Sequence, residues 1–485
     1  MSKSLLNPFS LPEKEDIDNI EKAISDLQID AIVRYVFVDV SKQKKILEIF
    51  ENLCTDKETI LYRQSVLRDF MFNSNRSLFY NIQKITQDME KTFSNYNALV
   101  SSRLKVKSKS EISLTDSQMS LKDYSLIILD LLRIYDKLDE VFTNYPPSSK
   151  GLQEIRDKVA KKVRSKRYPD LKKTLDNITK VAFGYNYVVD LDDELLPKEI
   201  KYVLCNGKYT GEKFTLFKKK EDIGKVELND RVTSDFKAIG LEAFNRVVVL
   251  LEDIFEGMYD DISYLQKEFL FFEFGVYLYD ILGERRIECT FPQIGEYTEY
   301  KNVIDSYLVI KYAKEDYRAK IYGNDVIINQ KESVLLVGGN NTGKTVFLRA
   351  IGISQIFGQS GLYIPGDFAQ IQIFSDLATI FSGEEKDTDV GGRFEKEVID
   401  IKEIIDIVDS KSLVIINEIF QSTFALDGQN ALFDILNYFT TINVSWICVT
   451  HLTGILDDKD NFESKVKCLM TLGEEQQYKI KEIDK

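Results

Sequence analysis

Apolar residues in the first 280 positions recur every three or four residues, which is the spacing of one helix face. The run SLIILDLLRIYDKLDEVF, Ser125 to Phe142, is the clearest example. Two prolines in NYPPSSKG, Asn144 to Gly151, end this pattern. The spacing therefore predicts a mainly helical half from about residue 12 to residue 282.

The longest helical pattern lies at the end of this half. Ile239 to Leu282 contains no proline, and about 44 residues at 1.5 Å each would form a rod of about 65 Å. A helix of that length outgrows a compact domain, so we expect a strut or lever. Two helices broken near Gly257 are the alternative.

A patch rich in aromatic and β-branched residues interrupts the helical half. It contains VAFGYNYVVDL (Val181 to Leu191), KYVLC (Lys201 to Cys205) and KFTLF (Lys213 to Phe217). Such runs predict strands, and Asn206-Gly207 is typical of a tight turn. We expect a small sheet inserted between helices.

The pattern changes in the second half, where short apolar runs alternate with helical segments. The apolar runs include SVLLVGG, LVIINE and SWICVTH, and the helical segments include TVFLRAIGISQIF and ALFDILNYFTTI. This alternation predicts a mostly parallel sheet flanked by helices, with ligands at the carboxyl ends of the strands. We expect the boundary between about Gly283 and Asp325.

Composition narrows the class of protein. The 485 residues are 44% hydrophobic and 29% charged, which is a globular balance in a chain too long for one ordinary domain. No apolar run approaches the roughly 20 residues that span a bilayer, and the N-terminus has no signal core. The five scattered cysteines predict reduced thiols and a cytoplasmic protein. The single histidine, His451, excludes a His-rich metal site.

Charge is unevenly distributed along the chain. The formal net charge is −14, whereas proteins that coat nucleic acid are usually basic. Arg156 to Lys180 nevertheless contains ten basic and three acidic residues. A solvated helix face and a phosphate-contacting surface both fit this stretch. The candidate nucleic-acid contacts are Lys161, Lys162, Arg164, Lys166, Arg167, Lys218, Lys219 and Lys220.

GGNNTGKT, Gly338 to Thr345, is the strongest motif. It satisfies G-x-x-x-x-G-K-[ST] between a predicted strand and a predicted helix. Its backbone N–H groups would form an anion nest at the positive end of the helix. Lys344 would reach the β- and γ-phosphates, and the Thr345 hydroxyl would ligate Mg²⁺. The expected nucleotide-binding residues are Gly338, Gly339, Asn340, Asn341, Thr342, Gly343, Lys344, Thr345 and Val346.

Two further strand ends supply candidate catalytic groups. LVIINE ends in Asn417 and Glu418, and Glu418 is the candidate general base that orients water for in-line attack. Asn417 would contact the metal through a water and brings no charge. SWICVTH ends in Thr450 and His451, where a γ-phosphate sensor would lie. An ordinary strand terminus and an ordinary surface or core histidine are the alternatives.

These motifs resemble the ATPase domain of the MutS mismatch-repair family. The resemblance covers roughly Ile321 to Leu452. It extends more weakly to DKETILYRQSVLRDF, which resembles the family's helical core, and to KEFLFFEFGVYLYDIL, which resembles its lever. The matching segments are NDVIIN, GGNNTGKTVFLRAIG, GLYIPGDFAQIQIFSDLATIF, GGRFEKEV, NEIFQSTFALDG and VTHL.

The resemblance implies an ABC-type ATPase that uses ATP and Mg²⁺ and works as a homodimer. The partner's signature segment, Gly391, Gly392 and Arg393 in this numbering, would complete each site in trans. Levers would carry the nucleotide state to a DNA clamp near the basic stretch. The implied parts are a helical core (1–115), a helical arm with the β patch (116–237), a lever and connector (238–320) and the ATPase domain (321–485).

Three departures from the family pattern shape the expected function. Asn417 replaces the metal-side Asp, Gly392 replaces the signature Ser, and the chain ends at YKIKEIDK, where the family continues into helices. We therefore expect slow hydrolysis or weak nucleotide-dependent dimerisation. Because no G-x-F-Y-E wedge occurs, we expect binding of structured or branched DNA rather than mismatches. A nucleotide-gated switch with little hydrolysis, and a factor acting on RNA or ribosomes, are alternatives.

Overall fold

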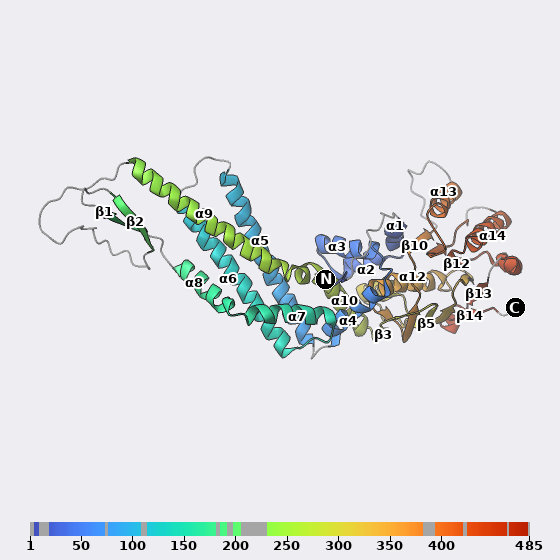
Figure 1. Ribbon diagram of the computed structural model, residues 1–485. Helices are drawn as coiled ribbons and strands as arrows, with labels where there is room; N and C mark the ends of the chain where they lie inside the picture. Colours follow the sequence, from blue (N-terminus) through green and yellow to red (C-terminus); the bar gives the residue numbers. More distant parts are fainter. Residues whose placement is uncertain are drawn as a thin grey trace. The chain divides into compact units, whose positions relative to one another are not determined.

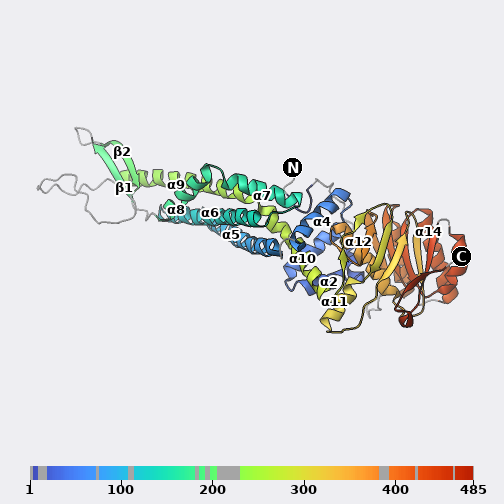
Figure 2. The same ribbon diagram turned by 90° about the horizontal axis from the view of Figure 1, so that it is seen from below.

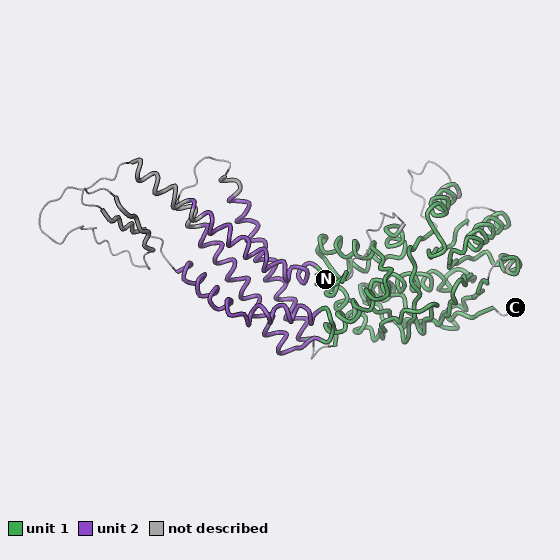
Figure 3. The backbone as a smooth tube through the Cα atoms, in the orientation of Figure 1, with its two compact units in different colours: residues 1–76, 148–151, 268–485 green, residues 77–147, 152–267 purple. Residues whose placement is uncertain are grey.

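A computed structural model describes residues 4–8, 19–72, 76–107, 114–180, 185–191, 197–204, 230–381, 393–420, 424–462 and 465–483. The chain divides into two compact units, coloured separately in Figure 3. Unit 1 comprises Met1–Arg76, Ser148–Gly151 and Glu268–Lys485, and unit 2 comprises Ser77–Pro147 and Leu152–Lys267. The four-part division expected from the sequence stays a prediction.

A six-stranded sheet forms the centre of unit 1 (Figure 1). Its strand order is β10-β11-β12-β7-β13-β14, and neighbouring strands are parallel except for β13 and β14. The mostly parallel sheet expected from the sequence is therefore confirmed. Its strands are β7 (Ser333–Val337), β10 (Asp376–Phe381), β11 (Ser412–Asn417), β12 (Ser445–Thr450), β13 (Val466–Thr471) and β14 (Ile480–Glu482).

Helices cover both faces of this sheet. Successive side chains of a strand point to opposite faces, so the apolar strands place apolar side chains on both faces, and each face is covered by helices. Val414 and Ile416 of β11 belong to a core shared with α13 and α14, whereas Ile415 lies against Gly352 of α12. Leu27, which follows α1 (Asn19–Asp26), contacts the same glycine. The helical segments from the P-loop to the C-terminus are α12 (Lys344–Ser360), α13 (Arg393–Ile405), α14 (Ala425–Thr441), η2 (Thr453–Asn461) and η3 (Glu474–Gln476).

N-terminal helices complete unit 1. α1 packs on β10, where Thr379 Oγ1 donates to Asp26 Oδ2 at 2.6 Å, and Lys22 pairs with Asp400 of α13 at 2.7 Å. Burial raises the pKa of Asp26 above its usual range, while Thr379 and Lys22 act the other way. The other helices that lie wholly or mostly in unit 1 are α1 (Asn19–Asp26), α2 (Ile29–Val36), α3 (Val40–Glu51), α4 (Lys57–Phe72), α10 (Ser263–Glu284) and α11 (Ser306–Lys314).

Short strands fill the region between α10 and β10. They form a four-stranded sheet of order β4-β9-β5-β6 and a separate pair, β3 with β8. β6 leads through a turn into β7, whereas β9 follows α12, so this small sheet combines strands from before and after the phosphate-binding motif. The strands are β3 (Cys289–Thr290), β4 (Gln293–Ile294), β5 (Thr298–Val303), β6 (Asn324–Ile328), β8 (Ile364–Pro365) and β9 (Phe368–Ile371).

Unit 2 is a bundle of long helices, whose side-by-side course is visible in Figure 2. Aromatic rings pack between its helices. Phe93 stacks on Tyr259 with 4.5 Å between the ring centroids, and Tyr96 stacks on Phe255 with 4.0 Å between the centroids. In the part of the chain that the structure describes, no helix is long and apolar enough to cross a membrane. The helices are α5 (Ser77–Lys107), α6 (Leu114–Asn144), α7 (Lys150–Val163), α8 (Arg167–Lys180) and α9 (Asp230–Asp260).

The single rod expected over Ile239 to Leu282 is wrong. α9 ends at Asp260 and α10 begins at Ser263, so the alternative of two helices broken near Gly257 is confirmed, with the break just after this glycine, at Asp261 and Ile262. Ile262 N bonds Tyr259 O and Leu265 N bonds Ile262 O, so tighter i+3 hydrogen bonds replace the α-helical pattern at the break.

The predicted β patch is confirmed for its first two runs. β1 (Tyr185–Leu191) and β2 (Pro197–Leu204) form an antiparallel pair. The third run, Lys213 to Phe217, and the Asn206-Gly207 turn lie outside the described residues.

Candidate nucleotide-binding site

The GGNNTGKT motif forms a tight loop between β7 and α12. β7 is buried along its length, and α12 begins at Lys344. Gly343 has a φ of +91°, a left-handed conformation that glycine adopts without steric cost. At Gly338 a Cβ atom would lie 2.1 Å from Thr471 Oγ1, so this position has no room for a side chain. The loop leaves the N-terminus of α12 available to an anion.

Lys344 is buried against this loop. Its side chain is 3% exposed, and Nζ donates to Gly339 O at 2.8 Å and lies 3.0 Å from Glu418 Oε1. A buried ammonium needs such partners because removing it from water is costly. The structure therefore brings the expected phosphate-binding lysine into contact with the expected general base.

Thr345 and Asn417 meet beside this pair. Thr345 Oγ1 donates to Asn417 Oδ1 at 3.1 Å. Two neutral oxygens suit Mg²⁺, which prefers oxygen ligands and keeps several of its waters. Among the described residues, no group of three or more His, Cys, Asp or Glu side chains could hold a metal. Mg²⁺ at this position would therefore depend on Thr345, on Asn417 through water, and on the phosphates of the nucleotide.

The backbone after β11 is strained. Glu418 and Phe420 have φ values of +51° and +62°, which residues other than glycine seldom adopt. Hydrogen bonds hold this conformation: Glu418 N donates to Val449 O, and Phe420 N donates to Glu397 Oε2, both at 2.9 Å. Held strain of this kind is frequent at functional sites. It fixes the backbone from which the Glu418 carboxylate extends.

His451 follows directly after β12, whose last residue, Thr450, is paired with Val337 of β7. The histidine is half-buried, and its Nδ1 is buried with no hydrogen-bond partner in the described part of the chain. Because buried ring nitrogens usually have a partner, a polar atom of a ligand would suit this position. The sensor role of His451 stays a prediction.

A cavity of about 460 Å³ opens beside the loop, within the usual size range of small-molecule sites. Residues 340–346 and Glu418 line it, together with Tyr312, Tyr322 and Tyr478. The cavity therefore combines a phosphate-binding loop with tyrosine rings that could stack on a flat ring. The described residues that were expected in the site but do not line this cavity are Gly338, Gly339, Asn417 and His451.

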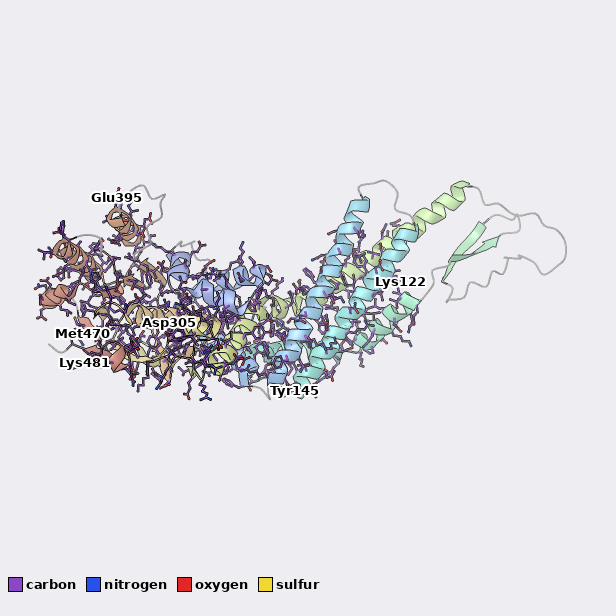
Figure 4. All side chains as sticks on the ribbon, turned by 180° about the vertical axis from the view of Figure 1, so that it is seen from behind. Lys122, Tyr145, Asp305, Glu395, Met470 and Lys481 are labelled. Carbon is purple, nitrogen blue, oxygen red and sulfur yellow. The ribbon has the colours of Figure 1, made fainter. Side chains whose placement is uncertain are left out.

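No sequence motif marks the tyrosines that line the cavity. Tyr312 belongs to α11, and this helix is fixed to α12 by Asp305 (labelled in Figure 4). Asp305 caps α11 and accepts hydrogen bonds from Arg349 Nε at 2.7 Å and Nη2 at 2.5 Å. Burial raises the pKa of Asp305, whereas Arg349 and two backbone amides act the other way. Tertiary contacts, rather than local pattern, position this wall.

The expected signature segment is described only at its end. Gly391 and Gly392 lie outside the described residues, and Arg393 is the first residue of α13. The contribution of these three residues to a partner's site stays a prediction.

The residues expected to contact nucleic acid fall into three groups: those in ion pairs, those exposed without one, and those outside the described residues. Lys162 pairs with Asp261 at 3.5 Å and Arg164 with Asp139 at 3.9 Å, within unit 2. Other members of the set are exposed, and no ion pair within the described residues involves them; these are Lys161, Lys166 and Arg167. Lys218, Lys219 and Lys220 lie outside the described residues.

Comparison with known proteins identifies the C-terminal third of the chain. Residues 334–483 match the family model described as MutS domain V. The C-terminal third of this chain belongs to the MutS domain V family. MutS domain V is an ABC-type ATPase domain, and its bounds here include the P-loop, Glu418 and His451. The resemblance expected from the motifs is therefore confirmed for this part of the chain.

Curated relatives align with the same region. The DNA mismatch repair protein MSH3 of Lodderomyces elongisporus is 29% identical over 157 residues, 32% of this chain and 15% of that protein. Endonuclease MutS2 of Ligilactobacillus salivarius is 31% identical over 134 residues, 27% of this chain and 17% of the relative. The DNA mismatch repair protein MutS of Petrotoga mobilis is 28% identical over 134 residues, 27% and 16% respectively. The alignments thus span less than a fifth of each relative.

Proposed function

We propose that this chain binds ATP with Mg²⁺ and hydrolyses it in its MutS domain V. The contact between Lys344 and Glu418 at 3.0 Å, beside the Thr345–Asn417 pair, carries this proposal. Phosphoryl transfer to water needs a phosphate cradle, a cation and a group that orients the water. The P-loop amides, Lys344 and Glu418 provide these three functions around one cavity.

The proposed reaction begins with an exchange of partners. The phosphates of ATP settle on the P-loop amides, and Lys344 moves its charge from Glu418 to the β- and γ-phosphate oxygens. The released Glu418 carboxylate then orients the attacking water and accepts its proton. Mg²⁺, when bound, supplies positive charge at the phosphate oxygens. Asn417 adds no negative charge to the metal's surroundings, so we propose that hydrolysis is slow.

A second candidate function is a nucleotide-gated dimerisation switch that hardly hydrolyses ATP. The neutral Asn417 beside Thr345 favours this reading, because it weakens metal binding without blocking the P-loop. Homodimerisation itself is proposed from the ABC-type domain.

We further propose that unit 2 contacts DNA, structured or branched rather than mismatched. The exposed cations Lys161, Lys166 and Arg167 support this, and two of the relatives named above are DNA mismatch repair proteins. The thiols of Cys289 and Cys448, which form no disulfide within the described residues, support a proposed cytoplasmic location.

Phosphate release from ATP, with and without four-way-junction DNA, tests the catalytic proposal beside a sizing measurement. Wild-type protein should release phosphate faster than Glu418→Ala, and Lys344→Ala should lose ATP binding. Equal rates for wild type and Glu418→Ala would remove the catalytic claim. A wild-type protein that binds ATP, dimerises and releases no phosphate would instead support the switch.

Salt-dependent binding tests the DNA proposal. Each phosphate contact contributes about 0.9 to the slope of log affinity against log salt concentration, so Lys161→Ala, Lys166→Ala and Arg167→Ala together should reduce that slope by up to about 2.7. Lys172→Ala, whose lysine pairs with Asp136 at 2.7 Å, serves as the control. Tighter binding to RNA than to duplex or junction DNA would favour the RNA-directed alternative. No binding at low salt would contradict both.

A further inference from the structure

The C-terminal hairpin consists of β13, β14 and the turn between them. Its first strand, β13, ends beside the phosphate-binding loop. β13 runs parallel to β7 with Met470 opposite Val337, so the next residue, Thr471, lies beside Gly338. Met470 and Lys481 mark the two strands of the hairpin in Figure 4. This register explains why Thr471 Oγ1 occupies the space that a side chain at Gly338 would need.

Thr471 is joined to the interior of the loop through hydroxyl groups. Thr471 Oγ1 and Thr342 Oγ1 are 2.5 Å apart, and Thr342 Oγ1 donates to Gly339 O at 2.8 Å. Because the Thr342 proton goes to that carbonyl, Thr471 is the donor in the bridge between the two hydroxyls. Gly339 O also accepts from Lys344 Nζ at 2.8 Å. The hydrogen bonds therefore connect the end of β13 with the P-loop lysine.

The turn of the hairpin makes a second contact with the loop. The Tyr478 ring lies against Gly343, with Cδ1 3.3 Å from the place of a Cβ atom there. Asn324 of β6 holds this turn, because its Nδ2 donates to Tyr478 O at 3.2 Å and its Oδ1 accepts from Ile480 N at 3.0 Å. Tyr478 has a φ of +55°, a conformation that such contacts must maintain. The hairpin thus touches the loop at both ends, Gly338 and Gly343.

We propose that the C-terminal hairpin is a positioning element of the nucleotide site and that Thr471 acts in it by fixing Thr342. This inference rests on the proposed function of the P-loop. The loop must keep Asn341 and Gly343 at positive φ for its amides to converge on phosphate. A loop already held in that arrangement loses less conformational freedom when phosphate binds. Thr471 acts on the triphosphate, through Thr342, and not on the base.

Thr471→Val tests the bridge, because it removes the hydroxyl and keeps the shape. Calorimetric titration with ATP and with inorganic tripolyphosphate should show about fivefold weaker binding of both ligands, as expected for one lost hydrogen bond. Thr471→Ser should restore both affinities, which a general loss of packing would not allow. Gln476→Ala, at an exposed position of the same hairpin, is the matched control. Wild-type affinity of Thr471→Val for both ligands overturns the inference.

Thr342→Val and the double variant complete a thermodynamic cycle. If the hydrogen bond between the two hydroxyls is what strengthens binding, the double variant binds ATP no more weakly than the weaker-binding single variant. Additive losses of affinity would mean that the two hydroxyls act separately, and they would overturn the inference. Thr342→Val also tests the bridge should Thr471→Val fold poorly. The failure of the proposed function is distinct, since wild-type protein would then bind neither ligand and would match Lys344→Ala.

Discussion

Replacement of Glu418 by glutamine should tighten ATP binding while it removes hydrolysis. The buried Lys344 ammonium lies 3.0 Å from the Glu418 carboxylate. ATP must replace that carboxylate as the partner of Lys344. Glutamine keeps the size of the side chain and lacks its charge, so the variant has no ion pair to lose when ATP binds.

The magnitude follows from the burial of the pair. Removal of one partner from a fully buried ion pair costs about 3–5 kcal/mol. The Glu418 side chain is 22% exposed and Gly339 O still accepts from Lys344, so we take about 1–2 kcal/mol for the nucleotide-free protein. The γ-phosphate supplies a new negative partner, and the loss is absent from the ATP complex. ATP affinity should therefore rise by about 5–30-fold, at about 1.4 kcal/mol per factor of ten.

Two measurements check this reasoning. Thermal unfolding without nucleotide should show a less stable Glu418→Gln protein, and titration with ATP and Mg²⁺ should show tighter binding with background phosphate release. Glu474→Gln makes the same chemical change at an exposed position of the C-terminal hairpin and should leave both unchanged. A Glu418→Gln protein with wild-type stability and wild-type ATP affinity would refute any energetic role of the Lys344–Glu418 contact.

Three further perturbations have defined outcomes. Asn417→Asp places a carboxylate beside Thr345 Oγ1 and should raise Mg²⁺-dependent phosphate release severalfold; an unchanged rate at saturating Mg²⁺ would show that the missing charge is not limiting. Arg349→Met leaves Asp305, 1% exposed, without its cation and should lower the free energy of unfolding by about 3–5 kcal/mol in urea, with partial recovery when Asp305→Asn is added. Burial raises the pKa of Asp26, so the folded protein binds this proton more tightly than the unfolded chain and stability falls as pH rises through the shifted pKa. Asp26→Asn should make the free energy of unfolding depend less steeply on pH just above the usual carboxyl pKa, and it should stabilise the protein at neutral pH. A pH dependence equal to that of the wild type, measured by urea titrations at several pH values, would contradict this.

The central strands and the phosphate-binding loop could be predicted because local pattern carries them. β7 and β11 are continuous apolar runs buried on both faces, and the P-loop follows the first of them at fixed spacing. β13 is less evident, since VKCLMT includes a lysine and an exposed Met470 among its apolar residues. Its place beside β7 depends on parallel pairing between residues more than 130 positions apart, which no local pattern records.

The break between α9 and α10 shows the same limit. Neither glycine nor proline marks Asp261 and Ile262, and helical periodicity continues across them. Lys162 of α7 pairs with Asp261 at 3.5 Å, so one contact at the break comes from a helix far away in sequence. A pattern that reads only neighbouring residues therefore predicts one helix where packing produces two.

Strand order determines which distant residues reach the nucleotide site. β7 lies between β12 and β13, so the loop that follows it has the end of β12 on one side and the end of β13 on the other. His451 follows the first neighbour, and its role as a γ-phosphate sensor stays a prediction. Thr471 comes from the second, beyond Leu452, where the recognisable motifs end. Because Gly338 must lack a side chain to admit Thr471, one glycine of the P-loop is explained by the C-terminal strand as well as by phosphate. The motif and the strand beside it are therefore best regarded as one structural unit.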